Sequence, residues 1–458
     1  MAPGEIAARI DRLPSTFVQW RYCLLTQLAY GFVTVCGSYA ASLYPYVWSS
    51  DFSHYKYSWL NAVQVGIGIL IGEYVGGYLA DWFGRRKVIT LGCLLSGLFV
   101  VAAAFVAPNY FGLMLVIFGQ AVGAGFVIAT NALYMHEIVP PKYRNRITLG
   151  AQSTTAIWAM VGFGLGHFLV PDHYRLYLVI LGAATVVSAA LLLTIPESPR
   201  WLEAKGRRNE ARTIVERIEK AVARRAGRLP EPDERAMLER PVAVTERVPV
   251  REVFQGEYLR RTLLLLPAWI LGYSGIVWGW AAYQAIHLEA YGFGASQFFL
   301  VSMITYGPGY ALGGVVFSFF NERFERRTLV LLGAVVFSLA FVIIWYFSYV
   351  HQVDTMLYIG WGLIGTGSAL WLFNMYNYTA AAYPTRLRST ATGITDGLGH
   401  VGAIFGPLVV VALGDATKSG GYYGFMLYCA IVGAIIPGVL IRMLGIRQKD
   451  ASLEGISA

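Results

Sequence analysis

The sequence predicts an all-α membrane protein with twelve transmembrane helices in two pseudo-symmetric six-helix bundles. Of the 458 residues, 56% are hydrophobic and only 14% are charged, whereas a soluble domain carries about 25% charged residues. Apolar runs of the roughly 20 residues that span a bilayer recur along the whole chain. The lipid bilayer is therefore the first partner that the composition implies.

Twelve apolar runs qualify as spans, and most of the loops between them are short. One such run can be a core helix of a soluble protein, but a dozen joined in this way is typical of a polytopic membrane protein. The expected spans are 21–47, 58–83, 88–107, 111–135, 147–170, 175–195, 262–288, 296–320, 327–350, 355–380, 389–414 and 421–445.

A charged stretch rich in Arg, Glu and Pro divides the spans into two groups of six. Within it, residues 207–225 place Ala211, Ile214, Ile218 and Val222 at helical intervals, which predicts an amphipathic helix on the cytoplasmic surface. The expected organisation is a cytoplasmic N-terminal segment, a first bundle, a cytoplasmic linker, a second bundle and a cytoplasmic tail, at 1–20, 21–195, 196–260, 261–445 and 446–458.

Basic residues predict the orientation of the chain. With the N-terminus inside, only Lys56, Arg175 and Lys418 of the 36 Lys and Arg residues lie in external loops. Because short cytoplasmic loops are enriched in Lys and Arg, both termini are expected to be cytoplasmic. The net charge of +9 reflects this sorting and does not call for a nucleic-acid partner.

Other classes of protein lack support in the sequence. Asp11 and Pro14 interrupt the N-terminal segment, and the apolar run that follows is too long for a cleavable signal peptide. The chain has no P-loop and no HExxH motif. No enzyme activity, cofactor or metal is expected, and the interpretation is a monomer in the inner membrane. The cysteines lie inside spans without metal-ligand spacing and favour packing roles: Cys23, Cys36, Cys93 and Cys429.

The two halves also share sequence patterns, as in transporters built from repeats. One pattern follows span 2 as Gly77, Asp81, Gly84, Arg85 and Arg86. It returns after span 8, shifted by 241 residues, as Ser318, Glu322, Glu325, Arg326 and Arg327. A second pattern, shifted by 244 residues, pairs Tyr134, Pro140 and Arg144 with Tyr378, Pro384 and Arg388.

These motifs resemble those of the major facilitator superfamily. The stretch 77–87 (GYLADWFGRRK) is similar to its signature loop between helices 2 and 3. Residues 196–202 (PESPRWL) and 378–388 (YTAAAYPTRLR) resemble the ends of helices 6 and 10 in its sugar-porter and organic-ion branches. The resemblance covers both halves and implies a two-bundle fold with alternating access.

The resemblance also implies a cytoplasmic gate of ion pairs that hold the outward-facing state. These residues would form it in the first half: Asp81, Arg85, Glu137, Arg144, Glu197 and Arg200. In the second half, Ala381 stands where the family usually has an acid, so that gate lacks one charge, and Arg388 pairs with Glu322 or with no acid. Gly77, Gly84, Arg86 and Arg326 complete the expected gate.

One departure concerns helix 7 of the sugar-porter branch. That helix usually carries a Gln pair and an Asn around a Gly, but here apolar residues and glycine surround Gly275. Gln152 does match the helix-5 glutamine of that branch. The end of helix 10 is closer to the organic-ion relatives, although their large domain between helices 1 and 2 is absent.

Three ionisable residues lie at similar depth inside spans, where such groups are costly and tend to be functional. Glu73 is eight residues from Asp81, roughly 12 Å along a helix. Asp396 and His400 share a face of span 11. Glycines every four residues in spans 2 and 11 predict that these helices pack closely across the seam between the halves. The hypothesis is a Glu73–Asp396–His400 cluster that couples protons to transport; a structural polar trio is the alternative.

The remaining polar and aromatic residues at the expected midplane are candidate substrate ligands, since amides bind carboxylates or hydroxyls and rings stack on planar solutes. Helix packing and interfacial anchoring are the alternative, above all for Trp278, Trp280 and His287. The expected lining is Gln27, Tyr30, Gln120, Asn131, Gln152, Trp280, Tyr283, Gln284, Asn374, Asn377, Tyr378 and His400.

The sequence therefore predicts a secondary active transporter of a small organic solute, coupled to protons. Protonated His400 favours an organic acid, aromatic in character, because it can accept an anion. Asp396 would equally suit an organic cation, and because of Gln152 a sugar is a further alternative substrate. A solute sensor that binds without transporting is the alternative from another class, supported only by Ala381.

Overall fold

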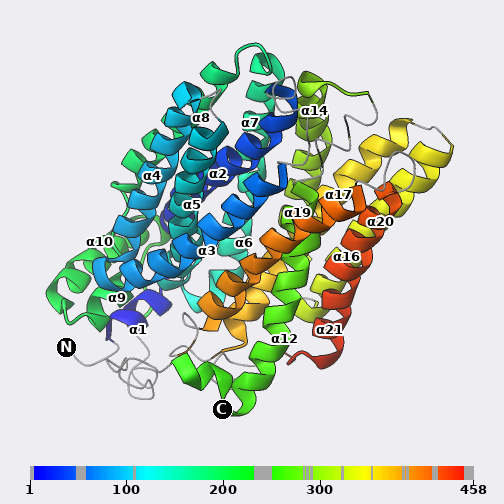
Figure 1. Ribbon diagram of the computed structural model, residues 1–458. Coiled ribbons are helices and arrows are strands. Elements are labelled where there is room, and N and C mark those ends of the chain that lie inside the picture. Colours follow the sequence, from blue (N-terminus) through cyan, green and yellow to red (C-terminus); the bar gives the residue numbers. More distant parts are fainter. Residues whose placement is uncertain are drawn as a thin grey trace.

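The computed structural model describes most of the chain, and every regular element in these parts is a helix (Figure 1). The first group of long helices comprises α2 (Phe17–Val47), α3 (Ser58–Phe83), α4 (Arg85–Val106), α5 (Tyr110–Ile138), α6 (Arg144–Ser153), α7 (Thr155–Leu169) and α8 (Tyr174–Leu192). The described residues are 5–47, 58–106, 110–231, 250–281, 284, 288, 292–320, 324–351, 354–383, 387, 391–414 and 421–447.

The second group contains more irregular helices. Several of them include π-helical turns, which are frequent at functional sites in helices. Its elements are α12 (Gly256–Gly272), η4 (Tyr273–Val277), α14 (Ala295–Val301), η5 (Ser302–Tyr306), α15 (Gly307–Phe320), α16 (Arg326–Ile343), η6 (Ile344–Val350), α17 (Asp354–Ala381), η7 (Gly393–Gly397), η8 (Leu398–His400), α19 (Val401–Gly414), α20 (Gly421–Leu427), η9 (Tyr428–Ile435) and α21 (Ile436–Leu444).

Short helices cover one end of the first group, which we call the charged end. They are α1 (Glu5–Asp11), α9 (Pro199–Ala204) and α10 (Arg208–Ala226), and they lie at the lower left of Figure 1. α10 covers the stretch expected to form an amphipathic helix, and it buries Ala211, Ile218 and Val222. Two short turns, η2 (Pro141–Tyr143) and η3 (Val250–Phe254), also lie near chain segments that join long helices.

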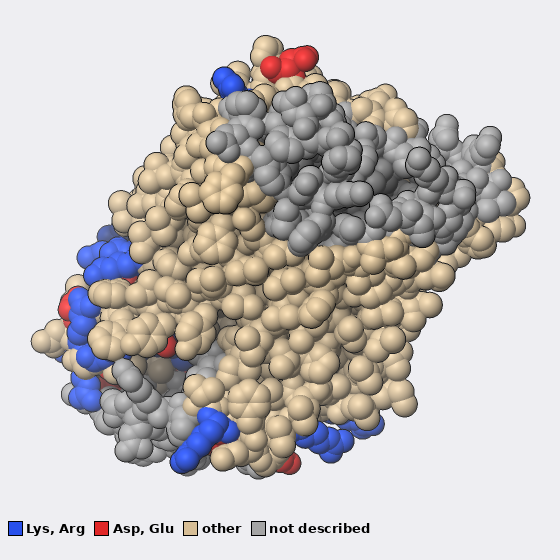
Figure 2. All heavy atoms as spheres, in the orientation of Figure 1, with Lys and Arg blue, Asp and Glu red and all other residues tan. Residues whose placement is uncertain are grey.

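Charge is distributed as a membrane protein requires. In Figure 2 the Lys and Arg side chains gather along the lower edge and over α10, and a broad band without charges lies above them. Many large apolar side chains of the described helices are exposed, including Leu98, Phe105 and Val187. Nine of the described segments are long and apolar enough to cross a bilayer.

The three other expected spans also contain helix. α2 occupies 21–47, and η7, η8 and α19 lie within 389–414. The span expected at 147–170 is not one uninterrupted helix, because α6 ends at Ser153 and α7 begins at Thr155. Between them, the Thr154 hydroxyl donates to the Ala151 carbonyl at 2.7 Å, a local hydrogen bond that competes with the helical pattern.

The glycines of span 2 pack differently from the expectation. Side chains added at Gly68, Gly72 or Gly76 would meet α5, so this stripe serves packing within the first group. The seam with α19 instead uses Gly66, where an added Cβ would lie 2.9 Å from the Cβ of Ala403. Periodicity identifies a stripe of small residues on α3. Because both faces of α3 pack against other helices, the sequence does not show which neighbour the stripe contacts.

The two groups of helices contact each other at the end opposite the charged end. The imidazole Nδ1 of His167 in α7 lies 2.8 Å from the Ser296 hydroxyl of α14. One turn deeper, the rings of Phe163 and Phe299 have centroids 6.3 Å apart. Nearer the charged end, Leu149 of α6 packs with Ala369 and Phe373 of α17.

Candidate functional site

A cavity of about 180 Å³ lies between the two groups of helices. α2, α3, α5 and α7 line it from one side, and η4, η5, α15, α17 and η8 from the other. Its polar and aromatic lining residues are Tyr30, Thr34, Gln120, Thr155, Phe163, Tyr273, Trp278, Trp280, Gln284, Tyr306, Tyr310, Ser368, Tyr376 and His400.

His400 and Glu73 meet at the wall of this cavity. The Nδ1 atom of His400 lies 3.3 Å from Oε2 of Glu73, and both side chains are buried. The same nitrogen lies 3.2 Å from the carbonyl oxygen of Asp396. The other carboxylate oxygen of Glu73, Oε1, is buried and has no hydrogen-bond partner in the described part of the chain.

Asp396 belongs to a second group of polar contacts beside this pair. Its Oδ1 accepts a hydrogen bond of 2.6 Å from the Tyr273 hydroxyl, which also lies 2.9 Å from the hydroxyl of Tyr376. The Tyr273 ring lies against the His400 imidazole, with centroids 4.1 Å apart and the ring planes tilted by 34°. The structure thus brings Glu73, Asp396 and His400 into one neighbourhood, with two tyrosines between helices as additional members.

Irregular helical turns position these side chains. The π-helical turn η7 contains Asp396, and the 3₁₀ turn η8 ends at His400. Opposite them, Tyr273 begins the π-helical turn η4. Gly399 permits the close approach of these segments, since an added Cβ would lie 2.6 Å from the Cβ of Trp269.

Five residues of the predicted lining do face the cavity: Tyr30, Gln120, Trp280, Gln284 and His400. Gln120 is held by its amide nitrogen, which donates to the Val33 carbonyl and the Ser96 hydroxyl, both at 3.2 Å. Its buried Oε1 has no partner among the residues that the structure describes, so a hydrogen-bond acceptor on the cavity wall stays available. Tyr283 lies outside the described residues.

The other predicted lining residues that the structure describes lie away from this cavity. The amide nitrogens of Asn374 and Asn377 donate to carbonyls one turn earlier in α17, while the buried Oδ1 of Asn374 has no partner among the described residues. The Tyr378 hydroxyl donates to the Ile446 carbonyl at the charged end. Gln27 accepts from Thr155 behind the cavity wall, and Asn131 and Gln152 are not among its lining residues.

Sequence reasoning missed the tyrosines that dominate the cavity. Tyr273, Tyr306, Tyr310 and Tyr376 all line it, and the rings of Tyr306 and Tyr310 are 5.9 Å apart. The four-residue spacing of that pair was the available signal. Tyr273 lies in the helix-7 region, where the sugar-porter pattern has amides and not phenols.

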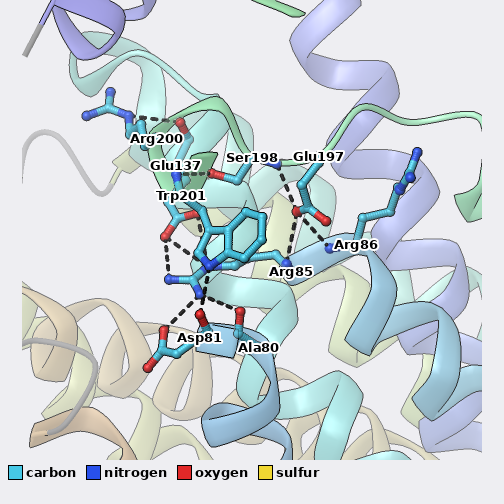
Figure 3. A network of polar contacts seen from close by, with 9 residues as sticks. All are labelled: Ala80, Asp81, Arg85, Arg86, Glu137, Glu197, Ser198, Arg200 and Trp201. Carbon is cyan, nitrogen blue, oxygen red and sulfur yellow. Dashed lines mark hydrogen bonds and ion pairs between the residues drawn. The ribbon is translucent and has the colours of Figure 1, made fainter. Parts of the chain in front are cut away.

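Arg85 is the centre of a polar network at the charged end (Figure 3). Its guanidinium lies 2.8 Å from Oδ1 of Asp81 and 3.1 Å from Oε1 of Glu137. A further hydrogen bond of 2.8 Å reaches the Ala80 carbonyl. The network joins the end of α3, the start of α4 and the end of α5, as the signature motif implied for Asp81, Arg85 and Glu137.

Glu197 has a different role from the expected ion pair. Its Oε1 accepts hydrogen bonds from the backbone N–H groups of Arg85, Arg86 and Ser198 at 2.9, 3.1 and 2.9 Å (Figure 3). A carboxylate at the start of α4 is favourable because the first N–H groups of a helix have no helical partners. Gly84 makes room for it, with a φ of +107° that suits glycine.

Some of the remaining gate residues lie in the described part of the chain and others do not. Arg200 pairs with Asp11 of α1 at 2.5 Å and donates to the Glu137 backbone carbonyl at 2.9 Å, not to the Glu137 carboxylate. Gly77 and Arg144 are in α3 and α6 at the charged end. The backbone carbonyl of Asn377 accepts from Arg326 at 3.4 Å. Glu322 and Arg388 lie outside the described residues.

Two helical groups around a central cavity, with a charged network at one end, define a membrane transporter. A family model described as "Sugar (and other) transporter" matches residues 22–444. The chain therefore belongs to this family of the major facilitator superfamily, and it is a multi-pass membrane transporter of the sugar and metabolite type, not an enzyme.

Several proteins of this kind are similar over most of their length. The niacin transporter NiaP of Acinetobacter baylyi is 28% identical, with 86% of each chain covered. The inner membrane metabolite transport protein YdjE of Escherichia coli is 26% identical, with 99% of this chain and 98% of that protein covered. Human solute carrier family 22 member 13 is 27% identical over 82% of this chain and 64% of its own.

Solved structures of the proton:xylose symporter XylE have the same fold. The form bound to 6-bromo-6-deoxy-D-glucose matches with a TM-score of 0.74 at 16% identity, covering 96% of this chain and 98% of XylE. The inward open conformation of XylE from E. coli matches with a TM-score of 0.69 at 15% identity, over the same shares.

Proposed function

We propose that the protein is a proton-coupled symporter of a small, planar organic acid, which works by alternating access across the inner membrane with both chain termini in the cytoplasm. The observation that carries the proposal is the contact of 3.3 Å between His400 and Glu73 on the cavity wall between the two bundles. The basic residues at the charged end support the orientation.

The geometry of His400 links anion binding to a proton. Its Nδ1 is occupied by Glu73 and the Asp396 carbonyl, which leaves Nε2 for the cavity. A neutral imidazole with its proton on Nδ1 offers only an acceptor at Nε2, whereas the imidazolium offers a donor there. A carboxylate substrate would therefore bind the protonated site and not the neutral one.

The two carboxylates next to His400 make the proton requirement stricter. With Glu73 and Asp396 both ionised, the site carries a negative charge that repels an anion at short range. Proton uptake at Asp396 or Glu73 removes this repulsion, and the Tyr273–Tyr376 pair offers hydroxyls within 2.9 Å of each other as a short hydrogen-bonded path. Substrate and protons would then enter the same occluded state together.

The shape of the cavity favours a flat solute. Tyr30, Tyr306, Tyr310 and Trp278 provide ring faces on its walls, and such rings stack on planar molecules. The indole nitrogen of Trp278 is buried without a partner among described residues and is a second donor for a carboxylate. Niacin, the solute named for the Acinetobacter relative, is a pyridine carboxylic acid and has this chemistry.

The deciding experiment is uptake of pooled carboxylates into proteoliposomes, with and without an inward proton gradient. Asp396→Asn is expected to reduce gradient-driven uptake while substrate exchange without a gradient continues, because the protonatable group is lost and the cavity is kept. Unchanged proton-coupled uptake by this variant would refute the coupling role of Asp396.

Thermal unfolding in detergent tests the substrate class. A ligand at a hundred times its Kd stabilises by about 2.7 kcal/mol, which a melting curve detects. Carboxylates should stabilise the protein more at about pH 5.5 than at about pH 7.5, and His400→Gln should reduce this difference to the part that proton uptake by Glu73 and Asp396 contributes. Stabilisation by cations instead would favour the alternative that Glu73 and Asp396 bind an organic cation.

A further inference from the structure

We propose that the cleft between α10 and the start of α4 is a binding site for the phosphate group of an anionic phospholipid. The cleft has a volume of about 270 Å³ and lies at the charged end, away from the substrate cavity. A single water molecule needs only about 15 Å³ of such volume, so the cleft has room for a phosphate group. The proposal does not depend on which solute is transported.

The first observation is the balance of charge in the cleft. Four basic side chains line it, and only two acidic ones, Glu197 and Glu210. Glu210 is paired with Arg207 at 2.6 Å, and Glu197 caps α4 through backbone N–H groups. Glu210 is thus paired, whereas the buried Oε2 of Glu197 has no partner among the described residues. Arg86, Lys87 and Arg217 outnumber this one carboxylate, so the cleft keeps a surplus of positive charge.

The second observation is that three basic groups keep donors available. The Nε of Arg86 is buried and has no partner among the described residues, although its Nη1 donates to the Ile195 carbonyl at 3.1 Å. Lys87 and Arg217 line the same cleft from α4 and α10, and neither has an ion pair with a described residue. Phosphate oxygens are the acceptors that such a cluster of cations binds.

The third observation identifies the source of the phosphate. Two lining residues are large, apolar and exposed: Phe83 is 56% and Leu193 is 62% exposed. Exposed apolar side chains continue from there along the bilayer-facing sides of α4 and α8, at Leu91 and Val187. A soluble phosphate would make no contact with this apolar surface. The acyl chains of a lipid would lie on it while the headgroup occupies the cleft.

A bound lipid would join two separate parts of the charged end. Arg86 and Lys87 belong to the signature loop, whereas Arg217 belongs to the linker helix α10. A phosphate between them would attach α10 to the start of α4 without a direct protein contact. We therefore expect anionic lipid to stabilise the packing of α10 on the first bundle.

The test is binding of phosphatidylglycerol to the full-length protein in detergent, measured by native mass spectrometry. Each Lys or Arg near an anionic headgroup contributes a factor of about five in affinity. The double variant Lys87→Ala/Arg217→Ala should therefore weaken binding by roughly thirtyfold. The matched control Lys220→Ala/Arg224→Ala removes two exposed charges of α10 that do not line the cleft, and it should bind as the unmodified protein does.

Two further ligands separate the sources of phosphate. Phosphatidylcholine should bind weakly to all variants, since its headgroup is neutral overall, and free glycerol phosphate should bind far more weakly than phosphatidylglycerol. Equal losses in both double variants, or no loss in either, would overturn the site. Free glycerol phosphate binding as tightly as the lipid would overturn its assignment to lipid. Melting temperatures of both variants without lipid check that they are folded.

Discussion

The charged ends of the two bundles use the same repeated motif with different chemistry. In the first bundle, the guanidinium of Arg85 reaches the carboxylates of Asp81 and Glu137. Its counterpart in the second bundle, Arg326, donates to the backbone carbonyl of Asn377 at 3.4 Å. Ala381, which is buried, stands at the repeat position of Glu137.

This difference affects how firmly each end is held. Hydrogen bonds between ionised groups are shorter and about twice as strong as neutral ones. At the position of Glu137 in α5, α17 carries the uncharged Ala381. The last turn of α17 therefore offers Arg326 a backbone carbonyl where α5 offers Arg85 a carboxylate. The link between α4 and α5 is therefore stronger than its counterpart between α16 and α17, and we expect the second bundle to loosen first at this link during transport.

Removal of Arg85 should produce the largest effect. Arg85 makes charge-assisted hydrogen bonds to Asp81 and Glu137, each worth about 1.5 kcal/mol, so Arg85→Ala should lower the free energy of unfolding in detergent by about 3 kcal/mol. Chemical denaturation measures this loss.

An exposed ion pair supplies the control for this variant. Arg212 pairs with Glu216 at 2.7 Å on the solvent face of α10, and such surface pairs contribute about 0–1 kcal/mol. Arg212→Ala should be close to the unmodified protein. Equal destabilisation by Arg85→Ala and Arg212→Ala would show that the Arg85 network contributes no more than an exposed pair.

Restoring the acid that the second bundle lacks should have the next largest effect. Arg326 already reaches the carbonyl of Asn377, one turn before Ala381. The carboxylate introduced by Ala381→Glu should pair with Arg326, stabilise the closed charged end by about 1.4 kcal/mol, and slow the initial uptake rate about tenfold. Ala381→Gln, of the same size but uncharged, should slow uptake much less; equal slowing by both would indicate a steric effect only.

A smaller effect is expected from the contact between the linker and the signature loop. The indole Nε1 of Trp201 donates to the Asp81 carbonyl at 3.0 Å (Figure 3). Trp201→Phe keeps most of the buried ring but removes this donor, which should cost about 1 kcal/mol. The melting temperature of this variant should lie between those of the unmodified protein and Arg85→Ala.

The smallest expected effect is on the attachment of α1 to the first bundle. Among the described residues, the second bundle has no counterpart of this helix. Arg9 and Arg12 contact the Glu219 carboxylate at 2.5 and 2.6 Å. Partial burial by itself would raise the pKa of Glu219, but hydrogen bonds from both arginines outweigh it and lower that pKa. The attachment is therefore complete above the usual carboxyl pKa of about 4.3 and is lost as the pH falls below it.

Hydrogen exchange of α1 measures this attachment. Protection of residues 5–11 should be high at about pH 6 and should fall at about pH 3. Glu219→Gln should give low protection at both values, whereas Glu216→Gln, on the exposed face of α10, should behave as the unmodified protein. Protection that stays high in Glu219→Gln would mean that the Asp11–Arg200 pair and the apolar contacts of Ile6 and Ile10 hold α1 without the Glu219 carboxylate.

The sequence predicted the part of the site in which ionisable residues lie at the same depth in their helices. Glu73, Asp396 and His400 were predicted to meet because each is an ionisable group at the same distance from the charged end, and the structure brings them together. The amides of Asn374 and Asn377 donate to carbonyls of their own helix and do not line the cavity, because an amide in a helix can bond a backbone carbonyl one turn away as readily as a solute. The sequence did not predict the cavity tyrosines, because tyrosine side chains pack between helices as often as they line a binding site.

The sequence by itself determined the membrane helices, their division into two repeated halves and the charged end, because apolar length, repeat spacing and charge are properties of the chain alone. Only the tertiary structure decided which helix each glycine stripe faces, that Glu197 caps α4, and that Tyr273 joins Asp396 to Tyr376. These depend on the rotation of each helix about its axis and on local π and 3₁₀ turns, which are set by packing against neighbours far away in the sequence.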